Sequence, residues 1–387
     1  MQASGLTHAI SGYPLQTHAE RRRAGHYRLE VVLERRAIAG RWREMARDGA
    51  ILPIHADSWL DAWSATYGSA ADATPLFVTL VDTRHNRDVI GLPLVRRLVG
   101  GRRVIEFVSA GLAHRNGPLI GALAPQDEPG AERLWRVIVS DLPAADILRL
   151  ANMPARMDGA VNPLALLTAA RPSSSTVGPV RIDDPRSDWR AGLASTFREE
   201  LRHAENIFEA RPGARFARVR SISEARRVLA ELGRLDARRG AQDHAHNAFH
   251  GALLERGLGA GEVILTALKI GETIAAAMIG VAHADHYAML RLAAHEQEWN
   301  GCALQGLLVE RTMKSLHADG FRIFEVPGDD ACLFDFGASR EPLYEIEKAL
   351  GWAGLPGVAR AKARRLIAAR PGLAAAVKRL RRVQPRL

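Results

Sequence analysis

The alternation of hydrophobic and polar residues is most regular in the second half of the chain. Its β-branched and apolar positions predict three antiparallel strands, over residues 262–269, 273–281 and 286–292. The period then changes to that of a helix over residues 303–317, and a further strand is predicted over 321–326. This last strand leads directly into Gly328, Asp329 and Asp330.

The first half of the chain repeats this rhythm. We predict strands over residues 26–33, 76–81, 89–95, 103–109 and 145–150, and helices over 36–47, 59–67 and 128–141. Before the three strands of the second half we expect a strand over 214–220 and helices over 195–210, 223–238 and 248–254. The segment 171–179 is rich in Ser and Pro and is predicted to link the two halves.

These patterns predict a duplicated α/β fold in which each domain is a mixed, mainly antiparallel sheet flanked by helices. The expected boundaries are a poorly ordered N-terminus (1–25), a first domain (26–170), a linker (171–189), a second domain (190–350) and a basic helical tail (351–387). A length of 387 residues suits two domains better than one.

Three antiparallel strands, a small-residue turn that opens a helix and a closing strand resemble the core order of the acyl-CoA N-acyltransferase (GNAT) fold. The chain also resembles bacterial acetyltransferase-like proteins of cellulose and exopolysaccharide biosynthesis. These are similar in turn to the peptidoglycan-bridge aminoacyltransferases, which carry two GNAT-like domains. The resemblance covers roughly residues 28–350, and its matching segments are 59–68, 89–94, 116–119, 147–154, 197–202, 249–250, 301–304, 328–331 and 336–337.

The resemblance implies transfer of an acyl group, with acetyl-CoA as donor and an amine or hydroxyl of a carbohydrate or cell-envelope precursor as acceptor. Two departures from the family pattern matter. Cys332 and Leu333 stand where the family has an aromatic–lysine pair, and the loop 300–303 keeps only part of the usual donor signature. A tRNA-dependent aminoacyltransferase, or a non-catalytic binding or scaffold protein of a polysaccharide-synthesis complex, therefore remain alternatives.

The turn before the predicted helix 303–317 is the expected donor site. Its residues are Asn300, Gly301, Cys302, Ala303 and Leu304. Gly301 permits close approach of a ligand to the backbone, and the free N–H groups of a helix N-terminus attract phosphate. The alternative is an ordinary strand-to-helix turn with Asn300 as N-cap.

Acyl transfer needs a base that accepts a proton from the acceptor. Asp329 is the expected catalytic base, because it follows the last strand and its neighbour Asp330 is expected to raise its pKa by repulsion between like charges. We expect Asp330, together with His114 and Asn116 of the loop 111–118, to bind the acceptor between the domains. A solvated acidic turn and an ordinary polar surface loop are the alternatives.

The composition of the chain argues against a metal site, a signal peptide and a membrane span. Two cysteines provide neither a disulfide framework nor zinc-ligand spacing, and His246 with His250 lacks a supporting carboxylate, so we expect no metal. The first twenty residues lack the apolar run of a signal peptide, and no apolar stretch is long enough to span a membrane. We therefore expect a cytoplasmic protein.

The net charge of +10 comes entirely from the tail. Residues 351–387 contain ten Lys or Arg and no acid, which leaves 43 basic residues (53 minus ten) against 43 acidic ones in residues 1–350. Such a tail can attach to an anionic membrane surface at the inner face of the membrane, or pack as a helix pair on the second domain. Nucleic acid is an unlikely partner, because no aromatic residue that would stack on bases follows Trp352.

Overall fold

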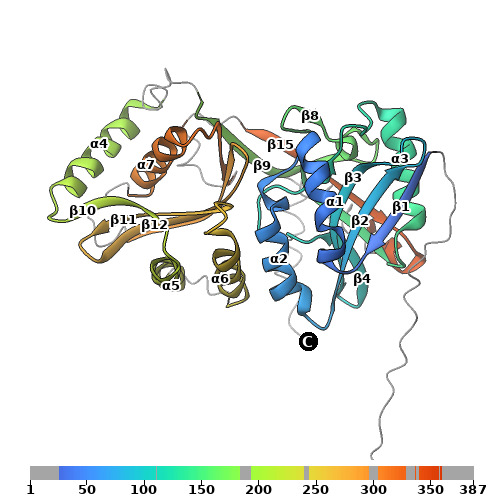
Figure 1. Ribbon diagram of the computed structural model, residues 1–387, viewed down its shortest axis with the longest axis horizontal. Coiled ribbons are helices and arrows are strands. Elements are labelled where there is room, and N and C mark those ends of the chain that lie inside the picture. The colour runs from blue at the N-terminus through green and yellow to red at the C-terminus, as the bar shows by residue number, and fades with distance from the viewer. Residues whose placement is uncertain are drawn as a thin grey trace, which may run out of the picture.

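The computed structural model describes residues 26–109, 111–183, 193–238, 244–295, 304–327, 336, 340–356 and 358–359. Helices cover both faces of a twisted sheet in each half of the molecule (Figure 1). We call residues 26–170 the first half and residues 190–350 the second half. The predictions of a poorly ordered N-terminus and of a helical tail fall almost entirely outside the described residues.

The first half begins with β1 (Tyr27–Val32), α1 (Arg35–Asp48), the short helix η1 (Pro53–His55) and α2 (Asp57–Thr66). After the one-turn helix η2 (Tyr67–Ser69), the chain forms the meander β2 (Ala73–Asp82), β3 (Arg87–Val99) and β4 (Arg102–Phe107). It continues through β5 (Leu119–Ile120), α3 (Glu128–Asp141), β6 (Ile147–Pro154), β7 (Arg156–Met157), β8 (Ala160–Val161) and η3 (Pro163–Leu166).

The second half follows β9 (Arg171–Arg181). It contains α4 (Ser195–Glu209), β10 (Ala214–Val219), α5 (Ile222–Arg238), α6 (His244–Gly257), β11 (Val263–Ile270), β12 (Thr273–His283) and β13 (His286–Ala294). It ends with α7 (Leu304–Ala318), β14 (Ile323–Pro327), β15 (Glu341–Ala349) and η5 (Trp352–Gly354). Every helix and strand listed above as a prediction is present in the structure, with small shifts of its ends.

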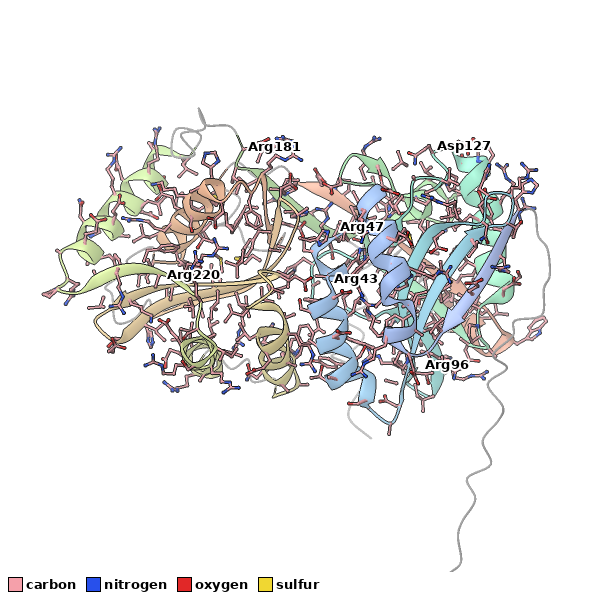
Figure 2. All side chains as sticks on the ribbon, in the orientation of Figure 1. Arg43, Arg47, Arg96, Asp127, Arg181 and Arg220 are labelled. Carbon is pink, nitrogen blue, oxygen red and sulfur yellow. The ribbon has the colours of Figure 1, made fainter. Side chains whose placement is uncertain are left out.

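Periodicity explains the helices locally. In α1, Ile38, Trp42 and Met45 recur at helical spacing and are buried against the sheet, while Arg43 and Arg47 point outward (Figure 2). At the start of α3, the Asp127 carboxylate accepts a hydrogen bond from the backbone N–H of Gly130 at 2.9 Å. This contact caps the helix and satisfies one of its free N–H groups.

The strands form one continuous sheet in the order β1-β2-β3-β4-β6-β15-β9-β14-β13-β12-β11-β10, with β5 paired to β3. In the first half β6 pairs in parallel with β4, and in the second half β14 pairs in parallel with β13. The two halves exchange one strand each, β15 and β9. β15, the last strand of the second half in sequence, pairs with β6 of the first half, and β9, which follows the first half in sequence, pairs with β14 of the second half.

This exchange corrects two expectations. Residues 171–181 of the predicted linker form β9, which lies between β15 and β14 in the middle of the sheet. Residues 341–349, assigned by sequence to the second domain, complete the sheet of the first half. The Ser- and Pro-rich composition was misleading because β9 is held by strands on both sides and does not need an amphipathic pattern of its own.

The halves also meet through helices α2 and α6 (Figure 1). Trp59 and Phe249 are fully buried there with their ring centroids 4.8 Å apart in an edge-to-face arrangement. The Glu262 carboxylate, from the second half, accepts a hydrogen bond of 2.8 Å from the backbone N–H of Ser58 in the first turn of α2. One hydrophobic cluster therefore includes residues of both halves.

None of the helices within the described residues is both long and apolar enough to cross a membrane.

The strand exchange predicts that a substitution in β15 weakens the first half. Ile346 is buried in the cluster that contains the first-half core, and it pairs with Leu150 of β6. We expect Ile346→Ala to lower the free energy of unfolding by about 2–4 kcal/mol. Urea unfolding measures this loss, and hydrogen exchange with mass spectrometry should show faster exchange in β4 and β6.

Lys348→Ala in the same strand is the control, because Lys348 is exposed and we expect a change within about 0.5 kcal/mol. Faster exchange confined to β10–β13 in Ile346→Ala would contradict the exchanged arrangement.

Candidate functional site

The parallel strands β13 and β14 separate partway along their length. They pair at His286–Ile323, Tyr287–Phe324 and Ala288–Glu325. Beyond that point β13 continues along β12 to Ala294, and β14 continues along β9 to Pro327. Within the described residues, no strand pairs with this side of β13 after Ala288. The separation therefore leaves backbone groups of β13 that an extended ligand can bind.

A β-bulge bends β13 where this separation begins. Ile279 pairs with Arg291 and Gly280 pairs with Met289, so Leu290 is an extra residue without a partner in β12. The bulge changes the direction of the β13 backbone next to the gap between β13 and β14. Gly280 is required there, because a Cβ atom at this position would lie 2.3 Å from Cζ of Tyr287.

Helix α7 begins at Leu304, beyond the end of β13. The Leu304 side chain is fully buried in the core of the second half, so only its backbone can contribute to the predicted donor site. Asn300, Gly301, Cys302 and Ala303 lie outside the described residues. Asp329 and Asp330 also lie outside them, immediately after β14. The roles of these six residues stay predictions.

A narrow cavity lies where the first half meets the separating strands. Its volume is about 10 Å³, which is room for roughly one water molecule. The second half contributes Ala288, Met289, Leu290 and Glu325, and the first half contributes Leu52, Pro53, Ile54, Ala113, His114 and Arg115. The structure thus places the predicted residue His114, which is partly buried, beside the start of the opening between β13 and β14.

A buried ion pair joins the two halves at this cavity. Nη1 of Arg115 donates to Oε2 of Glu325 at 2.6 Å, and the two side chains are only 8% and 6% exposed. His286 donates from Nε2 to the same carboxylate oxygen at 3.1 Å. Arg115 also contacts the carbonyl oxygen of Arg156 at 3.4 Å, while its Nε has no hydrogen-bond partner among the described residues.

The ion pair keeps Glu325 ionised. Burial alone would raise the pKa of Glu325, but the Arg115 charge and the His286 hydrogen bond outweigh it and lower this pKa to about 2. Glu325 is therefore an acceptor of hydrogen bonds at neutral pH and not a proton donor. The sequence signals neither partner, because Arg115 and Glu325 are separated by 210 positions.

His55 fixes the loop that carries Arg115. Its Nδ1 accepts from the backbone N–H of Leu52 at 3.0 Å, and its Nε2 lies 3.0 Å from the carbonyl oxygen of Gly117. Because Nδ1 accepts, the proton resides on Nε2 and the ring is neutral. Burial lowers the pKa of His55 to about 3, so the ring stays neutral across the physiological range.

The corresponding separation in the first half is bridged by the protein itself. β4 and β6 pair as far as Glu106–Arg149 and then diverge. Asn116 connects the two sides: its side chain accepts from Ser109 Oγ and donates to the Ala151 carbonyl oxygen at 3.2 Å. Its backbone N–H donates to the Asn152 carbonyl oxygen at 2.8 Å. Asn116 is only 4% exposed, and its predicted contact with an acceptor stays a prediction.

No cluster of three or more His, Cys, Asp or Glu side chains within the described residues has an arrangement that could hold a metal ion. His250, a residue of α6, is buried, and burial lowers its pKa to about 3. His246 lies 3.4 Å from the carbonyl oxygen of Gly111, which connects α6 to the first half.

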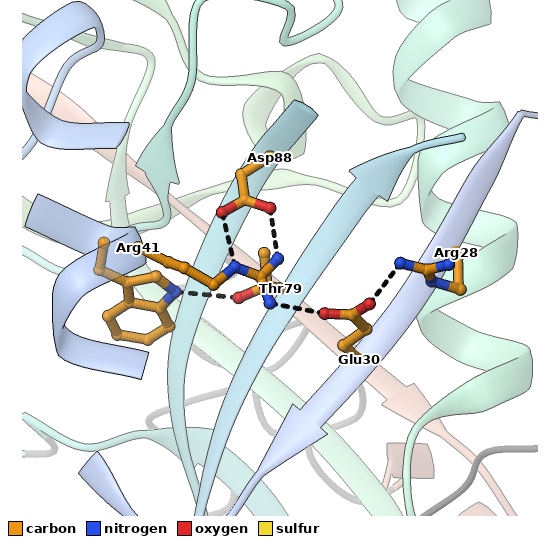
Figure 3. Close-up of polar contacts among 6 residues, drawn as sticks. Arg28, Glu30, Arg41, Thr79 and Asp88 are labelled. Atoms are coloured by element: carbon orange, nitrogen blue, oxygen red, sulfur yellow. Dashed lines mark hydrogen bonds and ion pairs between the residues drawn. The ribbon is translucent and has the colours of Figure 1, made fainter. Parts of the chain in front are cut away.

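A larger groove, with a volume of about 410 Å³, lies on the first half between β1, α1 and the β2–β3 turn. Arg41 lines this groove, and Figure 3 shows it between Asp88 and Glu30. Arg41 forms two bonds to the Asp88 carboxylate, at 3.1 and 2.5 Å, and one to Glu30 at 2.7 Å. Glu30 also accepts from Arg28 at 2.5 Å. These opposite charges neutralise one another, and none of the predicted site residues lines the groove.

Comparisons with known proteins agree with this architecture. Residues 195–335 match the model of the acetyltransferase (GNAT) domain. The structure of FemX superimposes with a TM-score of 0.58 at 10% identity, covering 84% of this chain and 98% of that one. The C-terminal domain of a protein described as a lysylphosphatidylglycerol synthetase from Agrobacterium fabrum gives 0.51 at 13% identity, covering 84% and 96%. No curated protein sequence matches this chain.

The GNAT-domain match confirms the expected fold class. The domain match falls on the second half, in which the strands β13 and β14 remain apart. At these identities, the solved structures support the fold alone.

Removing the charge of Arg115 tests the ion pair between the halves. We expect Arg115→Met to lower the free energy of unfolding by about 3–5 kcal/mol, because it leaves the Glu325 carboxylate buried with only His286 as partner. Arg226→Met is the matched control, since Arg226 pairs with Glu255 on the surface and should change stability by less than about 1 kcal/mol. Equal losses for both variants in urea unfolding would contradict this assignment.

The lowered pKa of Glu325 predicts a specific dependence on pH. Its stabilising contribution is complete above the ordinary value of 4.5 and is lost as the pH falls toward about 2. Over this interval we expect wild type to lose stability more steeply than Glu325→Gln, by up to about 1.4 kcal/mol per pH unit. Urea unfolding at a series of pH values measures both slopes, and parallel slopes would show that Glu325 is not held ionised.

Proposed function

We propose that this protein is an acyltransferase that moves an acetyl group from acetyl-CoA to an amine or hydroxyl of a carbohydrate or cell-envelope precursor. The observation that carries the proposal is the separation of β13 from β14 in the half that matches the GNAT domain. The backbone of β13 beyond Ala288 offers hydrogen-bonding groups to the extended part of the donor.

Two further features support the second half as the donor half. The bulge at Leu290 turns the backbone next to the opening, and Asn116 closes the equivalent opening in the first half. The turn 300–304 would hold the pyrophosphate, because it directly precedes α7 and a helix N-terminus favours negative charge.

In the proposed reaction the acceptor nitrogen or oxygen attacks the thioester carbonyl, the carbon–sulfur bond breaks and the thiolate leaves. Asp329, which follows β14 in the sequence, takes the proton from the acceptor. No covalent enzyme intermediate is needed. Glu325 does not serve as this base, because its pKa of about 2 makes it a weak proton acceptor.

The acceptor would approach along the junction of the halves, beside the small cavity described above. His114 and Arg115 of the first half line this cavity together with Leu290 of the second half. The carbohydrate class of the acceptor rests on the resemblance to polysaccharide-biosynthesis proteins. Aminoacyl transfer is the second candidate, favoured by the fold likeness to the described lysylphosphatidylglycerol synthetase.

Calorimetric titration with acetyl-CoA tests the donor assignment. We expect saturable binding by wild type, and binding at least about tenfold weaker in Gly301→Glu, because the added carboxylate repels the pyrophosphate. Gly259→Glu is the control, since a Cβ atom there meets open space and the site lies before β11. Asp329→Asn should bind acetyl-CoA normally and lower kcat by about 10²–10⁴-fold once an acceptor is found.

Each alternative has its own outcome in a thermal-shift assay, because a ligand that binds only the folded state must raise Tm. Stabilisation by aminoacyl-tRNA without any response to acetyl-CoA would favour aminoacyl transfer. Absence of a response to either ligand would favour a scaffold, a result that Leu333 in place of the family lysine would then explain.

A further inference from the structure

Exposed hydrophobic side chains gather at one end of the first half. Among the described residues, six large hydrophobic side chains are exposed. Four of them are Leu98 (57% exposed), Val99 (41%), Trp352 (90%) and Leu355 (50%). The first two lie at the β3–β4 hairpin tip, and the other two lie in the segment after β15.

These two segments are neighbours because both contact Asp146. The Asp146 carboxylate accepts from the backbone N–H of Arg103 at 2.8 Å, and Leu98 pairs with Arg103 across the hairpin. The Asp146 carbonyl oxygen accepts from the N–H of Leu350 at 3.0 Å and lies so close to Gly354 that a Cβ atom there would clash with it. We call Leu98, Val99, Trp352 and Leu355 the hairpin–tail face.

The tip of the β3–β4 hairpin projects from the end of the sheet. Gly100 and Gly101 have φ values of 56° and 75°, which is the conformation of a tight two-residue turn between antiparallel strands. Nothing lies within 4 Å of a Cβ atom placed on either glycine. The turn therefore holds Val99 and Arg102 at the outer end of the sheet.

Positive charge surrounds these apolar side chains. The hairpin carries Arg96, Arg97, Arg102 and Arg103, and Figure 2 shows Arg96 at this edge of the first half. Two of these arginines pair with acids, Arg97 with Glu106 at 2.5 Å and Arg103 with Asp146 at 3.4 Å, so the four arginines outnumber these two acids and the hairpin keeps an excess of positive charge. The ten Lys and Arg residues of the tail follow Leu355 directly in the sequence.

We propose that the hairpin–tail face docks on the surface of a lipid bilayer that contains anionic lipids. Trp352, Leu355, Leu98 and Val99 enter the interfacial layer, while the arginines and the tail bind acidic headgroups. An indole ring is well suited to this layer because it is apolar and carries one polar N–H. The proposal does not depend on the acyltransferase assignment.

The apolar side chains favour a bilayer over RNA as partner. A basic surface alone attracts both, because each is a polyanion. Binding of RNA bases uses aromatic platforms, whereas the three aliphatic side chains of this face gain free energy only by leaving water. Bilayer docking uses all four exposed side chains together with the arginines.

Vesicle binding of the full-length chain tests the proposal. Co-sedimentation with mixed phosphatidylcholine–phosphatidylglycerol vesicles is compared with pure phosphatidylcholine vesicles. We expect binding only to the mixed vesicles, and binding about tenfold weaker for the triple variant Leu98→Ser, Val99→Ser and Trp352→Ser. The control is Leu33→Ser with Leu123→Ser, which removes the other two exposed hydrophobic side chains of the described residues.

A second measurement, the quenching of tryptophan fluorescence by lipids, tests insertion of Trp352 independently of the charge of the tail. Lipids with brominated acyl chains should quench wild-type tryptophan fluorescence more than that of Trp352→Phe, because only an inserted indole approaches them. Equal vesicle binding by wild type and the triple variant would show that the tail acts without this face, and would overturn the proposal. Binding to tRNA without binding to vesicles would overturn it in favour of RNA.

Discussion

The central constraint on this molecule is the pairing of β9 with β15. β9 completes the sheet of the second half and β15 completes the sheet of the first half. Each half therefore needs a strand from the other part of the sequence. The register of β9 also positions the site, since Pro179 of β9 pairs with Glu325 of β14. A shift of one residue would turn Glu325 to the opposite face of the sheet, away from Arg115.

This strand arrangement brings Arg115 and Glu325 together as an ion pair. Burying two charges costs desolvation energy that the attraction between them offsets only with good geometry. The short contact and the second donor, His286, supply that geometry. The main role of the ion pair is thus to fix the position of the first-half loop against β13 and β14. Its net contribution to stability is small by comparison.

Local pattern was sufficient to predict the helices, the two meanders and the strand β14 that precedes Asp329, because their side chains alternate or recur against a core. It failed for β9, whose Ser- and Pro-rich sequence carries no period and which is defined by β14 and β15 on either side. It also missed the ion pair between Arg115 and Glu325, since nothing local to either residue indicates a partner 210 positions away. His114 lines the cavity at the junction of the halves, and its contact with an acceptor stays a prediction.

The duplicated fold makes one difference between the halves informative. Both contain a pair of parallel strands that separate, which is a geometry that leaves backbone groups in need of partners. In the first half Asn116 binds the carbonyl oxygens of Ala151 and Asn152 of β6 and is buried in doing so. In the second half, β13 after Ala288 pairs with β12 on one side, and no strand among the described residues pairs with its other side. Since unpaired backbone groups are costly unless water or a ligand binds them, the second half is where a ligand gains most from the fold.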